Sequence, residues 1–138
     1  MLSPPKKKAR SKIARKKLEL RKQLWPELKE QDLWNRQLTD GWLSVPRAMP
    51  HALRLMDRLG GKGKPVSATY FDIWCRTYDD SFVVVSSPSE MAYCAGFSGE
   101  RAHTTWSSRM RLLEELGFIE IKEGSTPINY VLLLNPFH

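Results

Sequence analysis

The chain has 138 residues, which is enough for one domain of ordinary size plus an extension. Hydrophobic residues make up 41% of it, including five Trp, so we expect a packed core and exclude a chain that is disordered throughout. No apolar run approaches the length of a membrane span, and the N-terminus lacks the apolar segment of a signal peptide. Cys75 and Cys94 lack paired spacing, so a cytoplasmic protein without a membrane partner is the expectation.

The net charge of +7 is concentrated at the N-terminus. Residues 1–22 contain seven Lys and three Arg against Glu19, whereas residues 23–138 contain 12 basic and 14 acidic residues, a net charge of −2. A concentrated basic segment attracts polyanions by counterion release, and nucleic acid is their commonest form. A solubilising terminus and an acidic membrane surface are the alternatives. We predict contacts to DNA phosphates from Lys6, Lys7, Lys8, Arg10, Lys12, Arg15, Lys16 and Lys17.

Residues 1–40 are predicted to form a basic tail and a helical arm. We expect disorder over residues 1–8, because Pro-Pro disfavours a helix and adjacent lysines repel, and a helix from about Ala9. Pro26 predicts a break or the first turn of a second short helix, which would include Leu33, Trp34 and Leu38. The turn dipeptide Asp40-Gly41 predicts the boundary with a domain over residues 41–138.

Two helices and a strand are expected in the first half of that domain. The first helix covers residues 49–59 and ends at Gly60-Gly61; the second covers residues 68–78 and is capped by Ser67 or Thr69. FVVV, at residues 82–85, predicts a short buried strand. Helical spacing predicts that the two helices bury Leu53, Met56 and Leu59, and Phe71, Trp74, Cys75 and Tyr78.

The run Ser87-Pro88-Ser89-Glu90 has the serine cap, proline and acidic first turn of a helix start. A short helix to Cys94 would close into a turn at Ala95-Gly96. Phe97 is the apolar residue expected to fill that turn, and Ser98 is expected to cap the following helix.

The helix after Ser98 has two contrasting faces. With Trp106 at the centre of the buried face, the apolar residues Ala102, Met110 and Leu113 fall close to it at 100° per residue. The opposite face is small, polar and basic, which suits contacts to base edges and phosphates, although an ordinary solvated face is the alternative. The predicted DNA contacts of this segment are Ser98, Glu100, Arg101, His103, Thr104, Thr105, Ser108 and Arg111.

A β-hairpin is predicted after Gly117. Ile119 and Ile121 alternate with polar residues, as in a half-buried strand, and the chain returns over residues 129–134. Gly124 and Pro127 set the turn of the tip at residues 123–128. At the tip, the residues predicted to contact a phosphate backbone or a minor groove are Lys122, Ser125, Thr126 and Asn129.

The segments SEMAYCAGFS and RMRLLEELGFIEI resemble the winged helix-turn-helix superfamily. The resemblance covers roughly residues 42–135 and implies a mainly α fold with a small antiparallel β-hairpin wing. GWLSVPRAM is similar to the start of such domains in bacterial plasmid and phage regulators or replication initiators. The twenty residues between Gly96 and Gly117 are about one turn more than is usual in this family. Either the recognition helix is longer, or Gly99 belongs to an extended turn.

The resemblance implies sequence-specific binding of double-stranded DNA by a recognition helix in the major groove, in a transcription or replication regulator. A homodimer would suit palindromic sites. The alternative is a winged-helix module that binds protein within a larger nucleoprotein complex, which the −2 charge of residues 23–138 favours. We expect a cytoplasmic, nucleoid-associated protein, or a nuclear one if the source is eukaryotic, because PPKKKAR resembles an import signal.

Neither an enzyme nor a cofactor is expected. Gly60–Pro65 lacks the spacing and context of a phosphate-binding loop, so it is interpreted as a helix-capping loop whose two lysines are available to a DNA backbone. The histidines His51, His103 and His138 do not have ligand spacing with the two cysteines, so no metal site is predicted.

Overall fold

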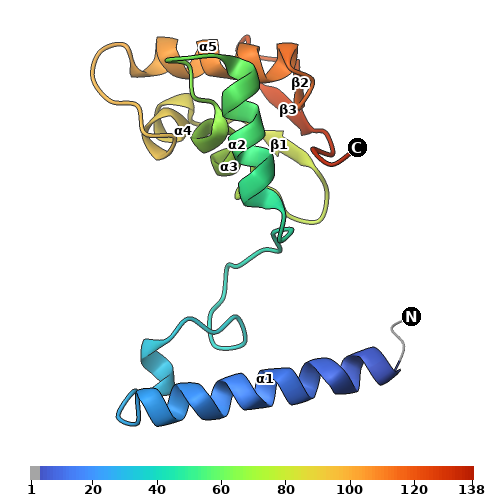
Figure 1. Ribbon diagram of the computed structural model, residues 1–138. Coiled ribbons are helices and arrows are strands. Elements are labelled where there is room, and N and C mark those ends of the chain that lie inside the picture. The colour runs from blue at the N-terminus through green and yellow to red at the C-terminus, as the bar shows by residue number, and fades with distance from the viewer. Residues whose placement is uncertain (1–3) are drawn as a thin grey trace. The chain divides into compact units, whose positions relative to one another are not determined.

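A computed structural model describes the backbone of residues 4–138 and the side chains from Ser11 onward. The chain divides into two compact units, Met1–Trp42 and Leu43–His138, which are described separately. Their helices and strands are labelled in Figure 1. None of the helices in the described part is both long and apolar enough to cross a membrane.

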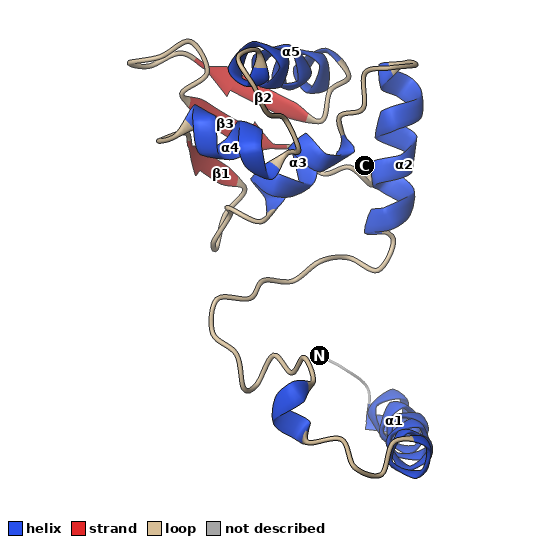
Figure 2. Cartoon of the chain, turned by 90° about the vertical axis from the view of Figure 1, so that its left-hand side faces the viewer, coloured by secondary structure: helices blue, strands red, loops and turns tan. Residues whose placement is uncertain are grey.

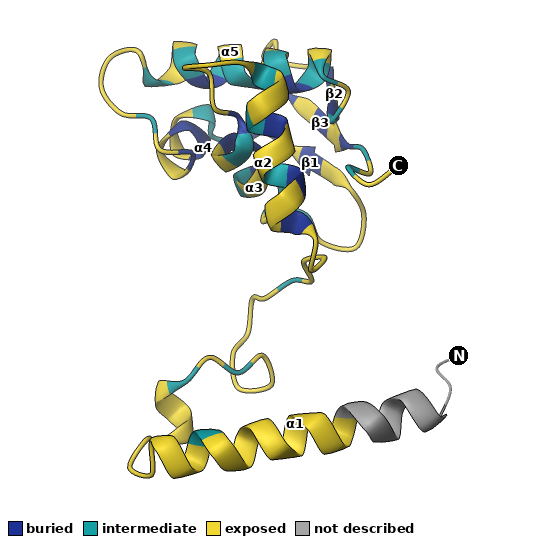
Figure 3. Ribbon diagram, viewed as in Figure 1, coloured by how far each residue is buried: buried dark blue, intermediate teal, exposed yellow. Residues whose placement is uncertain are grey.

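The first unit is dominated by α1 (Pro4–Leu24). The prediction of disorder through Lys8 is wrong from Pro4 onward, and its part on Met1–Ser3 lies outside the described residues. Proline is tolerated in the first turn of a helix, where its missing N–H has no acceptor to lose. The predicted break at Pro26 is confirmed, since α1 ends two residues earlier. Figure 3 shows almost all of the described surface of α1 as exposed.

The second short helix, the alternative to a break at Pro26, does not form. This segment contains only a 3₁₀ turn, η1 (Glu30–Asp32), which has no side-chain cap. Trp34 and Leu38 remain 71% and 67% exposed, and an isolated helix of this length is unstable without an apolar face packed on something. The Arg21 guanidinium and Glu30 carboxylate, 2.9 Å apart, tie the end of α1 to η1.

The second unit begins with α2 (Met49–Gly60), which buries Met49, Ala52 and Met56. Leu53 is partly buried, but the prediction for Leu59 is wrong, because its side chain is 53% exposed. The next inward position after Met56 is Gly60, one turn later. A Cβ built there would lie 3.4 Å from Leu112 Cδ2, so α2 closes on a neighbouring helix at a glycine.

The next helix, α3 (Ser67–Trp74), is shorter than predicted and buries a different face. Its buried residues are Thr69, Tyr70 and Ile73, whereas Phe71 and Tyr78 are exposed. Both sets have helical spacing, so periodicity alone cannot choose between them. Cys75 is also exposed, and Trp74 is only partly buried and donates from Nε1 to the Ser44 carbonyl at 3.2 Å.

The cap of α3 is neither Ser67 nor Thr69. The carboxylate of Asp57, on α2, accepts hydrogen bonds from Val66 N (2.7 Å), Ser67 N (2.8 Å) and Ser67 Oγ (2.6 Å). Asp57 therefore satisfies the free N–H groups at the start of α3 and places a negative charge at the positive end of its dipole.

Three strands form one antiparallel sheet in the order β1-β3-β2. They are β1 (Phe82–Val84), β2 (Ile119–Lys122) and β3 (Tyr130–Leu133), drawn in red in Figure 2. The predicted hairpin is confirmed. The strand at residues 82–85 is also confirmed, but as a half-buried one, because Phe82 and Val84 are exposed while Val83 is buried.

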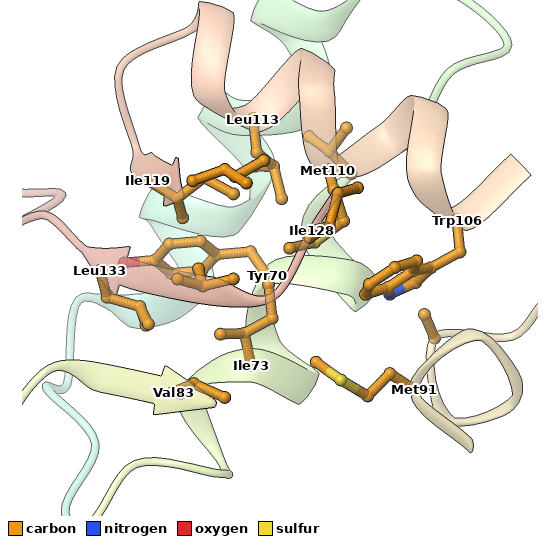
Figure 4. Close-up of a cluster of buried hydrophobic side chains, with 14 of the residues drawn as sticks. Tyr70, Ile73, Val83, Met91, Trp106, Met110, Leu113, Ile119, Ile128 and Leu133 are labelled. Carbon is orange, nitrogen blue, oxygen red and sulfur yellow. The ribbon is translucent and has the colours of Figure 1, made fainter. Parts of the chain in front are cut away.

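One core joins the inner face of the sheet to α3, α4 (Pro88–Cys94) and α5 (Ala102–Glu115). Figure 4 shows Tyr70, Met91, Trp106 and Met110 converging from these helices on strand residues that include Val83. Burial raises the pKa of the Tyr70 hydroxyl to about 12. The second unit is therefore mainly helical, with a small antiparallel sheet.

Candidate nucleic-acid interface

The helix pair α4 and α5 is joined by two glycine-dependent turns. The predicted start of α4 is confirmed, because Ser87 Oγ accepts a hydrogen bond from Glu90 N at 3.3 Å. Gly96 has φ +94°, a conformation that side chains rarely adopt, and it turns the chain after Ala95. Phe97 packs against the core in this turn, as predicted.

Helix α5 starts later than predicted, at Ala102 instead of after Ser98. Gly99 has φ +86°, which interrupts a right-handed helix, so the extra residues after Gly96 belong to an extended turn. Ser98 is consequently not its cap. Arg101 occupies the cap position without a side-chain hydrogen bond, and Glu100 and Ser98 lie in the turn.

The buried face of α5 is as predicted, and its polar face is narrower than predicted. Trp106, Met110 and Leu113 are buried, with 1% or less of each exposed, and Ala102 packs at the margin of the core. Thr105 and Ser107 are partly buried, and His103 is exposed, 6.0 Å from the ring of Trp106. The residues that point away from the core are called the polar face of α5: Arg101, Thr104, Ser108 and Arg111.

The polar face of α5 lies in a locally basic segment of a unit whose net charge is zero. Residues 43–138 contain ten basic and ten acidic residues, yet residues 101–113 contain three Arg and no acid. Arg101 forms no ion pair with any described side chain. Arg111 is exposed and lies 3.4 Å from the half-buried Glu114, whose other carboxylate oxygen accepts a hydrogen bond from Ile121 N at 2.8 Å, so solvent screens this ion pair only on the arginine side.

Arg109 is a residue of the site that the sequence did not reveal. It donates to the carbonyls of Pro65 (3.0 Å) and Gly63 (3.4 Å), and its guanidinium lies 5.4 Å from the ring centroid of Phe97. These contacts hold the α2–α3 loop, with the exposed Lys62 and Lys64, beside α5. Backbone carbonyls carry no residue-type signal, so no sequence pattern could have identified this contact.

On its other flank, α5 adjoins the β2–β3 loop. A hollow of ≈ 340 Å³ separates them and brings together three predicted contact residues, His103, Arg111 and Thr126. Trp106 forms part of its wall, and the indole Nε1 has no hydrogen-bond partner among the described residues. The remaining lining residues are Pro88, Ser107, Pro127 and Ile128.

Three of the four contact residues predicted for the hairpin are exposed, Lys122 at the end of β2 and Ser125 and Thr126 in the β2–β3 loop. The prediction for Asn129 is wrong, because its side chain is 7% exposed and fully used inside the unit. Its Oδ1 accepts from Ser125 N at 2.9 Å and its Nδ2 donates to the Val85 carbonyl at 3.3 Å. A Cβ on Gly124 would overlap the Asn129 amide, so the loop closes tightly on this residue.

The basic arm belongs to the first unit. Lys12, Arg15, Lys16 and Lys17 are exposed on α1. The side chains of Lys6, Lys7, Lys8 and Arg10 lie outside the described residues. Because the two units have no defined relative placement, the arm and the polar face of α5 are separate features of the chain.

The described residues contain no group of three His, Cys, Asp or Glu side chains that could hold a metal ion. Cys75 and Cys94 are free thiols. Partial desolvation of the exposed Cys75 thiol and the negative charge of Asp72 raise its pKa, which lowers its thiolate fraction and its reactivity.

No protein-family model matches the chain, and neither a curated protein nor a solved structure is significantly similar to it.

Proposed function

We propose that the second unit is a winged helix-turn-helix domain that binds double-stranded DNA sequence-specifically, with α5 in the major groove. The observation that carries this proposal is the pair of faces on α5. One face anchors the helix in the core through Trp106, Met110 and Leu113, and the other is exposed, basic and free of acids from residue 101 to residue 113. An α-helix fits the major groove of B-DNA.

The side chains of the polar face suit base and phosphate contacts. Arginine can donate two hydrogen bonds to a guanine, and the hydroxyls of Thr104 and Ser108 are short enough to let the helix backbone approach base edges. Arg101 and Arg111 are ten residues apart, or roughly 15 Å at the helical rise, so a helix lying along the groove would place them over different base pairs.

The flanks of α5 supply candidate phosphate contacts. Lys62 and Lys64 lie on the loop that Arg109 holds, and Ser125 and Thr126 lie in the β2–β3 loop, the proposed wing. The basic arm adds affinity that depends on salt and not on sequence. A regulator of transcription or replication in a bacterium, plasmid or phage is the role that we propose for this combination.

The test is selection of a binding site from random duplexes with the full chain, followed by affinity measurements on variants. Arg101→Ala and Arg111→Ala should each weaken binding to the selected site by roughly 10- to 100-fold, as expected for a lost paired base contact. Arg54→Ala is the matched control, because Arg54 is an exposed arginine on α2, outside the polar face. Equal affinities for all three variants would refute the proposal.

A second candidate function is a protein-binding winged helix that the arm attaches to a nucleoprotein complex. The balanced charge of residues 43–138 favours it, since dedicated DNA-binding domains usually carry a basic body. Replacement of Lys12, Lys16 and Lys17 by alanine would then weaken DNA binding equally on every sequence, with no preferred site. Under the main proposal, the same replacement lowers affinity and the salt dependence but keeps the preference for the selected site.

A further inference from the structure

The outer face of the sheet, opposite the core, is an ordered array of exposed side chains. The strand register places directly paired residues on the same face, and three strands with two outward residues each give two rows. One row is Phe82, Leu132 and Glu120, and the other is Val84, Tyr130 and Lys122. All six side chains are exposed.

Four of these six residues form a continuous apolar patch on β1 and β3. Phe82, Val84, Tyr130 and Leu132 are 44%, 54%, 37% and 41% exposed. The rings of Phe82 and Tyr130 stack with centroids 6.1 Å apart. Contiguous exposed apolar surface of this kind marks an interaction site more often than isolated exposed residues do.

We propose that this outer sheet face binds the same face of a second copy of the chain. A two-fold axis running across the strands, between the two rows, keeps each strand over its counterpart and exchanges the rows. Phe82 then faces Val84 of the second copy, Leu132 faces Tyr130, and Glu120 faces Lys122. Every apolar residue meets an apolar one and every acid meets a base, as a two-fold interface requires.

The pairing of the two sheets is specific, because the other two-fold axis parallel to the sheet would place apolar residues against charged ones. A two-fold axis along the strands would exchange β1 with β2 and place Phe82 against Glu120 and Val84 against Lys122. The register of the sheet thus selects one pairing from the two. A patch of six side chains is smaller than the roughly 800 Å² per partner of a standard interface, so the dimer is weak and forms in a concentration-dependent equilibrium.

Sedimentation equilibrium of the full chain over a concentration series tests the pairing. Glu120→Lys and Lys122→Glu each turn both Glu–Lys contacts of the dimer into like-charge contacts, so each should raise the dimer dissociation constant by roughly tenfold. The double variant Glu120→Lys/Lys122→Glu restores opposite charges and should return the constant to that of the unmodified chain. Leu132→Thr should also weaken the dimer, because it removes apolar contact while keeping a residue that favours strands.

Glu123→Lys is the matched control, since Glu123 is exposed in the β2–β3 loop, off the sheet face. It should leave dimerisation unchanged. Thermal unfolding of each variant confirms that the fold persists. The proposal is overturned if the chain stays monomeric at every concentration, or if the single charge reversals do not weaken the dimer. It is also overturned if the single variants weaken the dimer and the double variant does not restore it. A sheet face that binds a different protein gives the first result.

Discussion

Replacement of Asn129 by alanine should destabilise the second unit instead of removing a DNA contact. The change deletes the acceptor of Ser125 N and the donor to the Val85 carbonyl. Ser125 is exposed, so its N–H regains a hydrogen bond from water and only the net value of the protein hydrogen bond is lost. Val85 is 5% exposed, and its carbonyl loses the bond at 3.3 Å that Asn129 supplies.

A buried group left without its partner costs about 1–3 kcal/mol, and the lost Ser125 bond adds about 0.5–1.5 kcal/mol. We therefore expect the free energy of unfolding to fall by about 1.5–4.5 kcal/mol. For a unit of this size, 1 kcal/mol lowers Tm by roughly 4–8 °C, so a loss near the middle of that range, about 3 kcal/mol, should lower Tm by roughly 12–24 °C.

Thermal and urea unfolding, followed by circular dichroism, measure the change. Thr126→Ala is the control from the same loop, because Thr126 is exposed, and it should remain within about 0.5 kcal/mol of the unmodified chain. Asn129→Asp sharpens the test, since it keeps an acceptor for Ser125 but sets a carboxylate oxygen against the Val85 carbonyl. That variant should be less stable than the alanine variant at neutral pH and should recover when acid protonates the carboxyl. A loss of DNA affinity with unchanged stability would refute the structural role of Asn129.

Three further predictions concern the supports of the site. Asp57→Ala removes the carboxylate that holds the start of α3, so urea unfolding should show that the free energy of unfolding falls by about 2–4 kcal/mol. Asp57→Asn keeps one acceptor oxygen and should cause a smaller loss. The Tyr70 hydroxyl remains neutral up to about pH 12 in the folded state but ionises near pH 10 in the unfolded state. Its contribution to the free energy of unfolding is therefore complete below pH 10 and is lost between pH 10 and 12. Alkaline melts should show this loss, up to about 2–3 kcal/mol, in the unmodified chain but not in Tyr70→Phe; parallel curves would contradict it. Trp106→Phe should destabilise the unit less than Met110→Ala in the same urea assay. The tryptophan change removes a buried indole N–H that has no partner as well as side-chain volume, whereas the methionine change only leaves a cavity. The opposite order would show that the indole Nε1 is hydrogen-bonded.

Local signals in the sequence predicted the helix pair α4 and α5 and the β2–β3 hairpin well. The cap of α4 depends on residues three apart, the turn on Gly96, and the buried face of α5 on the spacing of Trp106, Met110 and Leu113. Each of these is decided within a few residues of chain, by capping, backbone conformation or helical periodicity. The position of Gly99 left two alternatives, and only its φ angle selected the extended turn.

Signals that depend on contacts between distant segments failed or were absent. Periodicity allowed two faces of α3, and packing chose the one with Tyr70 and Ile73. The role of Arg109 depends on carbonyls more than forty residues earlier in the chain, as the separations of 44 and 46 residues show. Asn129 was expected at the surface because hairpin tips are polar, but its amide faces Val85 on the neighbouring strand segment.

The sequence by itself determined the order of helices and strands in the second unit, the polar and basic face of α5, and the concentration of positive charge in residues 1–22. These follow from composition, from caps and from periodicity, all of which act over short stretches of chain. The tertiary structure alone decided which polar residues remain available to a partner. It buried Asn129, used Arg109 and Asp57 to hold backbone groups of other segments, and left Arg101, Thr104, Ser108 and Arg111 exposed. The physical reason is that a polar side chain is consumed wherever the fold buries a backbone group that needs a hydrogen bond, and those meetings are set by packing between segments far apart in the chain.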